Sequence, residues 1–316
     1  MALGSRKPSE ATPWPRMLGE GRSLAKSLPD LLVEARRISN TIVAGWHGRR
    51  RSGPGETFWQ FRPFVSGETT QAVDWRRSAR DDHIYVREQE WDAAHTAWLW
   101  TDLSASMNFK SHLAPVTKRE RSLVLMFAVA DLLARGGERV GVLGLSRPVA
   151  SRNAAELVSN TLLHAKLDTA WPDTQMVREF SEVIVFGDFL DLVSDLTAWL
   201  DGLAASGARG HLVQVLDPLE ETFPFGGRTE FIDPETGMKL VSGRAEDWRE
   251  HYLERMRERR ERLRLFVDRL GWTFQIHHTD RPASEPLLAL YAGLSASDSG
   301  GGGRDRPRGL IGEVRL

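Results

Sequence analysis

The stretch TAWLWTDLSASMNF, Thr96 to Phe109, begins as an apolar strand and ends in a cluster of small oxygen-bearing side chains. The apolar run stops at Asp102, and Ser104 and Ser106 follow at two-residue intervals. A chain that leaves the strand in extended form turns these three side chains the same way. Two interpretations stay open: a turn that caps the next helix, or half of a site for a hard cation, Mg²⁺ or Mn²⁺, which prefers carboxylate and hydroxyl oxygens.

Predicted strands and helices alternate after Thr96. Strands are expected at residues 97–101, 139–145, 182–186, 211–216 and 272–277, and helices at 118–135, 154–166, 190–206 and 244–270. This alternation predicts an α/β fold with a doubly wound, mainly parallel sheet covered on both faces. Between the strand ending at Leu216 and the long helix, we expect an insertion at about residues 218–243. It reads as a β-hairpin that turns at Asp233 to Gly237.

A second aspartate, Asp188, follows another predicted strand. In open α/β sheets, ligands bind at the carboxyl ends of the strands, near the point where the strand order reverses. Asp102 and Asp188 both occupy such positions, which favours the metal interpretation over a simple helix cap. Two hydroxyls and two carboxylates leave an octahedral cation short of ligands, so an acidic side chain of a partner could complete its shell.

The chain divides into four predicted parts. Residues 1–22 read as a disordered leader, and residues 295–316 as a flexible Gly-rich tail. Residues 23–92 form an N-terminal region, irregular α+β, with a helix at Ser27 to Trp46 followed by loops and short strands. Residues 93–294 form the main domain, including the hairpin insertion.

Composition and motifs exclude several functions. The 316 residues contain no cysteine, which excludes disulfides and thiol nucleophiles, and the net charge is −1. Eight arginines between His47 and Glu90 are nearly balanced by seven acids, so nucleic-acid binding is not expected. There is no G-x-x-x-x-G-K-[ST] and no G-x-S-x-G, and an enzyme is not expected. No apolar run approaches the ~20 residues of a membrane span, and we expect a cytoplasmic protein.

The region upstream of Thr96 resembles a known family. The segments VDWRRSAR, Val73 to Arg80, and VREQE, Val86 to Glu90, are similar to the signature of the bacterial domain-of-unknown-function family 58. The D-x-S-x-S pattern itself resembles the metal-ion-dependent adhesion site of von Willebrand factor A domains. The resemblance covers roughly Gly45 to Tyr291 and implies a von Willebrand factor A-like, Rossmann-like fold.

The resemblance also implies site residues and a partner. Of the family's metal ligands, Asp102, Ser104, Ser106 and Asp188 match directly. The threonine usually supplied by the second loop is replaced at best by Ser151, with Thr169 a weaker candidate. Members of the family are commonly encoded beside MoxR-type AAA+ ATPases and are thought to assist them as chaperone-like or assembly modules. The resemblance therefore implies a non-enzymatic, metal-dependent interaction module that binds such an ATPase or its client.

Three alternatives stay open. A metal-dependent phosphate-ester hydrolase could use Asp102 and Asp188 to hold Mg²⁺. The same fold could persist with a decayed metal site. The VDWRRSAR segment, with Asp74, Trp75, Arg76 and Arg80, is either a partner-binding surface or a structural latch. In the latch, Asp74 and Glu88 pair with arginines and Trp75 packs on the main sheet.

Overall fold

The computed structural model describes residues 14–46, 58–64, 73–80, 83–89, 95–165, 171–190 and 193–299. The chain divides into two compact units. Unit 1 comprises Met1–Val43 and His95–Leu316, and unit 2 comprises Ala44–Ala94. All of the candidate metal ligands that the structure describes lie in unit 1.

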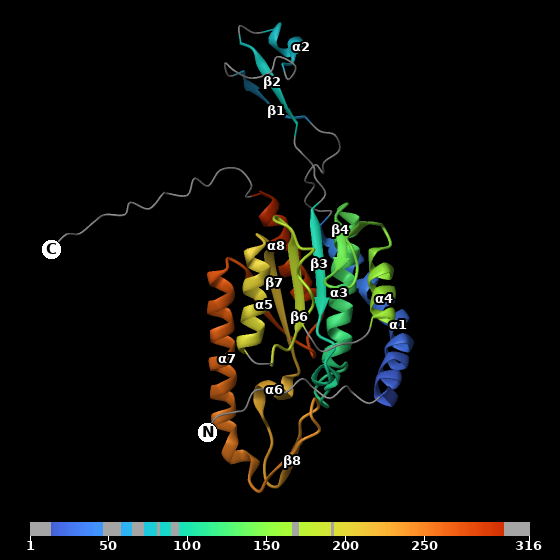
Figure 1. The fold of residues 1–316 in the computed structure, drawn as a ribbon, viewed down its shortest axis with the longest axis vertical. Coiled ribbons are helices and arrows are strands. Elements are labelled where there is room, and N and C mark those ends of the chain that lie inside the picture. The colour runs from blue at the N-terminus through green and yellow to red at the C-terminus, as the bar shows by residue number, and fades with distance from the viewer. Residues whose placement is uncertain are drawn as a thin grey trace, which may run out of the picture. The chain divides into compact units, whose positions relative to one another are not determined.

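Unit 1 is built on a six-stranded sheet with the order β10-β7-β6-β3-β4-β5 (Figure 1). Neighbouring strands run parallel except β5, which is antiparallel to β4. The expected α/β fold with a mainly parallel sheet is thus confirmed. The strands are β3 (Thr96–Thr101), β4 (Arg139–Val142), β5 (Val149–Ala150), β6 (Glu182–Gly187), β7 (Arg209–Leu216) and β10 (Thr273–His278).

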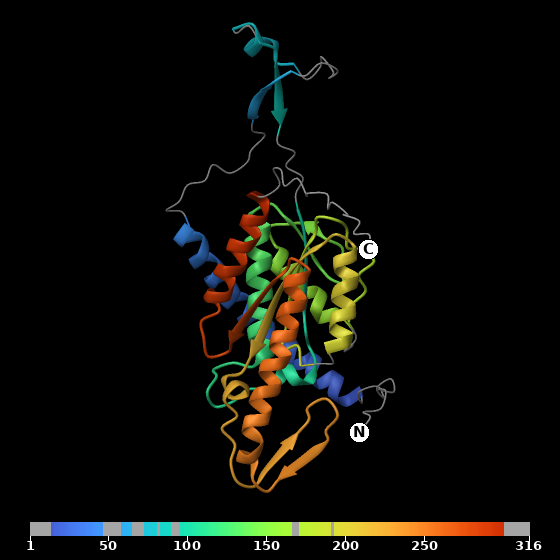
Figure 2. The same ribbon diagram turned by 90° about the vertical axis from the view of Figure 1, so that its left-hand side faces the viewer.

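Helices cover both faces of this sheet, as Figures 1 and 2 show. One face packs against α1 (Trp14–Trp46), α3 (Lys118–Arg135), α4 (Ala154–His164) and α8 (Ser284–Ser299). The other packs against α5 (Val193–Ala205) and α7 (Arg249–Arg269). Along β3 the side chains alternate between the two cores, so Leu99 joins the first and Trp98 the second.

The chain reverses its winding between β3 and β6. After β3 it proceeds through α3 to β4 on one side, and later returns to place β6 on the other side of β3. The helix that follows β3 covers one face and the helix that follows β6 covers the other. The carboxyl ends of β3 and β6 therefore form the switch point at which ligands bind in open α/β sheets.

Helix α1 belongs to unit 1 and is longer than expected. It begins at Trp14, within the leader predicted for residues 1–22. The apolar stripe of α1 is buried in the core of unit 1. For this reason α1, up to Val43, belongs to a different unit from the rest of the region predicted at residues 23–92. The buried stripe comprises Leu28, Leu31, Ala35, Ile38 and Ile42. Similarly, α8 continues to Ser299, into the predicted tail. Residues 1–13 and 300–316 lie outside the described part of the chain.

A β-hairpin lies between β7 and α7. Helix α6 (Pro218–Thr222) precedes it, and the 3-10 helix η3 (Ala245–Trp248) follows it. Its strands β8 (Thr229–Ile232) and β9 (Lys239–Ser242) pair antiparallel, with Ile232 opposite Lys239. Residues 233–238 connect the two strands. Figure 2 shows the hairpin at the end of unit 1 where the sheet's strands β7 and β10 finish.

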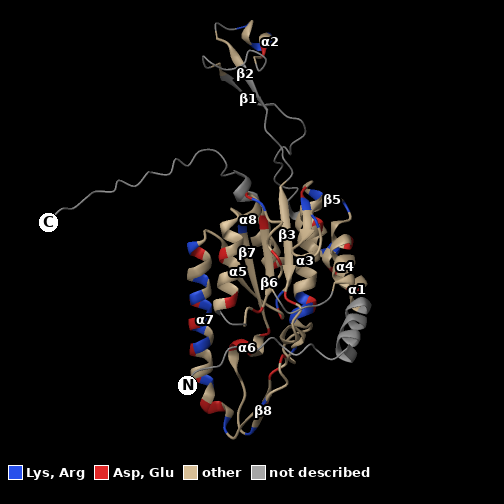
Figure 3. Cartoon of the chain, in the orientation of Figure 1, with Lys and Arg blue, Asp and Glu red and all other residues tan. Residues whose placement is uncertain are grey.

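The long helix α7 carries both signs of charge along its length (Figure 3). Arg260 pairs with Glu221, and Arg264 lies 3.9 Å from Asp268. Leu263 and Val267 form its buried face. The mixed charges outside that face are typical of a solvated helix surface.

Unit 2 contains β1 (Phe58–Pro63) and β2 (Tyr85–Gln89), paired antiparallel, and the short helix α2 (Trp75–Ser78). Asp74 caps α2 by accepting a hydrogen bond from the Arg77 backbone N–H at 2.9 Å. The expected latch assigned Asp74 to an ion pair, whereas its Oδ1 caps this helix. The Trp75 side chain is 62% exposed, and Arg76 and Arg80 are also exposed.

Candidate functional site

Asp102 and Asp188 lie at the same edge of the sheet. The backbone N–H of Asp102 donates to the carbonyl of Phe186 at 2.8 Å, which ties the ends of β3 and β6 together. Gly187 permits this approach, because a Cβ there would lie 3.2 Å from the Cβ of Asp102 and 3.3 Å from the Phe189 ring. Asp102 and Asp188 therefore lie at the ends of neighbouring strands, at the switch point.

The segment after Asp102 forms a turn. The backbone N–H of Ser104 donates to Asp102 Oδ1 at 2.8 Å, and residues Ala105–Asn108 form the 3-10 helix η2. The expectation of an extended exit from the strand is wrong beyond Ser104. The turn nevertheless brings the two hydroxyls together, with Ser104 Oγ 3.0 Å from Ser106 Oγ.

Asp188 joins these hydroxyls. Ser106 Oγ donates to Asp188 Oδ2 at 2.8 Å, across 82 residues of sequence. The carboxylate is held in place from the other side by the Leu190 backbone N–H, which donates to Oδ1 at 3.0 Å. Gln214 Nε2 on β7 donates to the Asp188 carbonyl at 2.8 Å. Asp102, Ser104, Ser106 and Asp188 are called the strand-end cluster below.

A lysine that the sequence analysis did not consider contacts the cluster. Lys118 Nζ lies 2.8 Å from Asp188 Oδ2 and 2.7 Å from Glu220 Oε1, and its side chain is 1% exposed. Burial alone would lower the pKa of Lys118, but the attraction of these two carboxylates more than offsets it and raises the pKa. Lys118 begins α3, where the helix dipole disfavours a cation, so the carboxylates are needed to stabilise it.

Glu220 is positioned by the start of α6. Asp217 caps this helix, and Glu220 Oε2 accepts the Asp217 backbone N–H at 2.8 Å, which completes a capping box. The other carboxylate oxygen of Glu220 faces Lys118. Burial raises the pKa of Glu220 by more than the neighbouring Lys118 ammonium lowers it.

The donor set of the cluster suits a small divalent cation. Adjacent oxygens around octahedral Mg²⁺ lie about 2.9 Å apart, because its Mg–O bonds are about 2.1 Å long. The pairs Ser104 Oγ–Ser106 Oγ and Ser106 Oγ–Asp188 Oδ2 are separated by 3.0 and 2.8 Å. The charge of the site also suits a cation. The three carboxylates of Asp102, Asp188 and Glu220 carry more negative charge than the Lys118 ammonium neutralises. Hydroxyls are necessary to the set: no three His, Cys, Asp or Glu side chains are grouped to hold a metal ion within the described ranges.

The hydroxyl expected from a second loop does not reach the cluster. Ala150 pairs with Arg139 at the amino end of β4, so Ser151 follows at the opposite edge of the sheet. The reason is that β5 turns back antiparallel to β4, whereas the sequence predicted no strand at residues 149–150. Ser151 Oγ accepts the Asn153 backbone N–H at 3.2 Å, a local turn. Thr169 lies outside the described residues.

Sequence reasoning missed three charged residues around the cluster. Lys118 is the first residue of the charged run KRER that opens α3, which is a weak signal for a buried lysine. The D-x-x-E spacing of Asp217 and Glu220 is recognisable as a capping box. The third residue, Glu235 in the hairpin turn, accepts a hydrogen bond from the Ser106 backbone N–H at 2.8 Å. Only the folded chain brings it there, since 129 residues separate the two.

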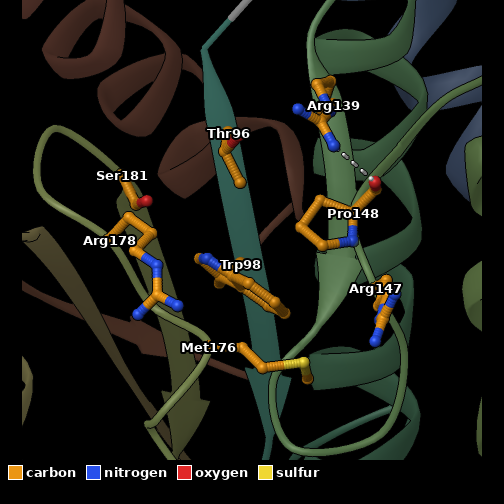
Figure 4. A pocket seen from close by; sticks show the side chains of 8 residues that line it. All are labelled: Thr96, Trp98, Arg139, Arg147, Pro148, Met176, Arg178 and Ser181. Carbon is orange, nitrogen blue, oxygen red and sulfur yellow. Dashed lines mark hydrogen bonds between the residues drawn. The ribbon is translucent and has the colours of Figure 1, made fainter.

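A pocket of about 330 Å³ lies away from the cluster, along the amino-terminal half of β3 (Figure 4). Trp98 forms its centre, with Met176 and Pro148 beside it and Arg139, Arg147 and Arg178 around it. The strand-end cluster follows the carboxyl end of β3 at Thr101 and contributes no residue to this pocket.

Within the described residues, no helix is both long and apolar enough to cross a lipid bilayer.

The fold and the cluster define an α/β protein with a mainly parallel sheet that gathers carboxylates and hydroxyls at its switch point. The chain belongs to the DUF58 family, described as "Protein of unknown function DUF58", whose model matches residues 60–262. It is 25% identical over 235 residues to uncharacterized protein Rv1480 of Mycobacterium tuberculosis, covering 68% of this chain and 72% of that one. Uncharacterized protein Mb1516 of Mycobacterium bovis matches to the same extent.

Two solved structures show a distant likeness. The conserved hypothetical protein BatB from Bacteroides thetaiotaomicron is 13% identical, with a TM-score of 0.39, covering 64% of this chain and 100% of that one. An aerotolerance-related membrane protein from Bacteroides fragilis gives a TM-score of 0.38 at 13% identity and the same coverage. At this level of likeness nothing about the function of this chain follows.

Proposed function

We propose that unit 1 is a von Willebrand factor A-like interaction module that binds a divalent cation, Mg²⁺ or Mn²⁺, through the strand-end cluster. The observation that carries the proposal is the hydrogen bond between Ser106 Oγ and Asp188 Oδ2 at 2.8 Å. It joins two loops at the switch point and gives an oxygen spacing that suits an octahedral shell. A bound cation would supply positive charge and an open coordination position for a carboxylate.

The residues of the chain have distinct parts in this proposal. Ser104 and Ser106 offer neutral oxygens, which leave the cation electron-poor and receptive to a further anionic ligand. Asp102 orients the turn through the Ser104 N–H. Asp188 is fixed by Leu190 and Gln214, so it keeps its position whether or not a cation is present. A rigid arrangement of this kind favours binding, because little ordering is required.

The proposed partner is a MoxR-type AAA+ ATPase or a client of that ATPase, as the family resemblance implies. The partner would present an aspartate or glutamate to the cation. Purified chain is used to capture a purified MoxR-type ATPase in Mg²⁺ and in chelator, with Ser106→Ala as the matched variant. Recovery is expected only with wild-type chain in Mg²⁺. Equal recovery in chelator would count against the proposal.

A second candidate keeps the fold but needs no metal. Lys118 favours it, because its buried ammonium already neutralises part of the charge on Asp188 and Glu220. In this alternative the Ser106 N–H would receive a partner's carboxylate directly, while Lys118 stays buried against Asp188 and Glu220. Calorimetric titration with Mn²⁺ separates the two, since the metal-free alternative predicts no heat of binding.

The hydrolase alternative stays a prediction with its own test. A screen of phosphomonoesters and phosphodiesters with Mg²⁺ would show turnover that disappears in Asp102→Ala if that alternative holds. The interaction module predicts no turnover in either protein.

A further inference from the structure

The hairpin turn between β8 and β9 is held by its own hydrogen bonds. The Gly237 N–H donates to the Asp233 carbonyl and the Asp233 N–H to the Met238 carbonyl, both at 2.8 Å. Asp233 Oδ1 accepts the Glu235 N–H at 3.0 Å, and Gly237 adopts φ +70°, which closes the turn. The backbone that presents the Glu235 side chain is therefore ordered by the turn itself.

From this turn, Glu235 reaches the strand-end cluster. Its Oε1 accepts the Ser106 N–H at 2.8 Å, and the Oγ of the same serine is bonded to Asp188. A carboxylate of the chain itself thus lies beside the hydroxyl oxygens. The negative charges of Glu235 and Asp188 meet around one serine, an arrangement that a cation at the cluster would stabilise.

One face of the hairpin packs on aromatic rings, whereas the other face and the turn are exposed. Phe231 stacks on Phe223 with ring centroids 5.6 Å apart and on Trp248 at 5.9 Å. Ile232, Met238 and Leu240 are 56%, 71% and 57% exposed, although Leu240 pairs with Phe231. The Ser106 contact is a single exposed hydrogen bond, so the turn at residues 233–237 can leave Ser106 while the ring stacking of Phe231 persists.

We propose that Glu235 is an internal acidic ligand of the strand-end cluster, which occupies the position that a partner's aspartate or glutamate takes. This inference rests on the proposed function. The partner is then one that presents an acidic side chain on a protruding loop, and it must displace the hairpin tip to bind. In the free protein Glu235 therefore occupies the partner's position. A partner binds less tightly as a result, because part of its binding free energy is used to displace Glu235.

The test uses the full chain with Glu235→Ala and the matched control Glu230→Ala. Glu230 lies on the same hairpin and pairs with Lys239 at 2.6 Å, so the control removes a hairpin carboxylate without touching Ser106. Hydrogen–deuterium exchange is followed at the Ser106 amide in chelator. We expect at least fivefold faster exchange in Glu235→Ala and unchanged exchange in the control.

Acetate is then titrated into the protein in Mg²⁺ as a carboxylate probe. The amide chemical shift of Ser106 reports its binding. The midpoint for acetate is expected to fall at least threefold in Glu235→Ala and to stay at the wild-type value in Glu230→Ala. Unchanged exchange and an unchanged midpoint in Glu235→Ala would overturn the inference.

Failure of the proposed function has a different signature. Calorimetry of wild type with Mg²⁺ would show no binding, while faster Ser106 exchange in Glu235→Ala would still support an internal carboxylate at this serine. Conversely, Mg²⁺ binding that is lost in Ser106→Ala, together with unchanged exchange in Glu235→Ala, would keep the proposed function and reject the internal ligand.

Discussion

The ammonium of Lys118 lies 2.8 Å from the Asp188 carboxylate, and both side chains are almost completely buried. A second carboxylate, Glu220, contacts the same ammonium at 2.7 Å. At the end of the sheet, the Lys118 ammonium therefore neutralises part of the negative charge of the carboxylates.

Replacing Lys118 tests this balance. Lys118→Met leaves Asp188 and Glu220 without their buried partner, so we expect a loss of about 3–5 kcal/mol in the free energy of unfolding. Because the surplus of negative charge grows, Mg²⁺ should raise the melting temperature of this variant more than that of wild type. Chemical denaturation and thermal melts with and without Mg²⁺ measure both effects. Wild-type stability in the variant would show that the pair does not support the fold.

Helix α1 is expected to stabilise unit 1. Ile42 is 3% exposed in the core, so Ile42→Ala should lower the free energy of unfolding by about 2–4 kcal/mol. Val33 on the same helix is 69% exposed, and Val33→Ala should change it by less than about 0.5 kcal/mol. Urea denaturation compares the two. Equal effects would mean that α1 does not pack as described.

Two glycines with opposite surroundings test the packing behind the sheet. A Cβ on Gly210 would lie 1.8 Å from the Trp272 ring, so Gly210→Ala should destabilise unit 1 by about 3 kcal/mol or more. Gly202 lies in α5 with no atom within 4 Å of such a Cβ, and Gly202→Ala should stabilise by about 0.5–1 kcal/mol. Differential scanning calorimetry measures the change in melting temperature of each variant. A change of the same sign in both variants would contradict the described packing.

His277 makes stability depend on pH. Burial, together with the nearby Arg121 and His278, lowers the pKa of His277 to about 3. Below the unfolded-state pKa, only the unfolded chain takes up this proton, so stability falls as pH drops from 6.5 toward 3. At about 1.4 kcal/mol per pH unit the loss reaches about 3 kcal/mol at pH 4. His277→Leu should lose less stability between pH 7 and 4 than wild type; equal losses would contradict the assignment.

The sequence predicted the central strands well because β6 and β7 are buried on both faces. Glu182–Gly187 is buried throughout, and its neighbours carry the same apolar runs, which length and flanking helices identify as parallel strands. The aspartates at the ends of β3 and β6 followed from that topology. Asp102 and Asp188 could therefore be brought together without coordinates.

The remaining parts of the site depend on distant contacts. The position of Ser151 after a predicted strand does not determine which edge of the sheet it occupies. The direction of the two-residue strand β5 does so, and two residues carry no recognisable pattern. Lys118 and Glu235 reach the cluster through side chains whose partners lie 70 and 129 residues away. No local periodicity encodes such pairs.

The most direct measurement is the anomalous scattering of crystals soaked in Mn²⁺. We predict one strong peak within bonding distance of Ser104 Oγ and Ser106 Oγ, beside Asp188, which disappears in Ser106→Ala crystals. An anomalous map that shows no peak at these hydroxyls, in crystals where Lys118 still contacts Asp188, would contradict the cation-dependent site.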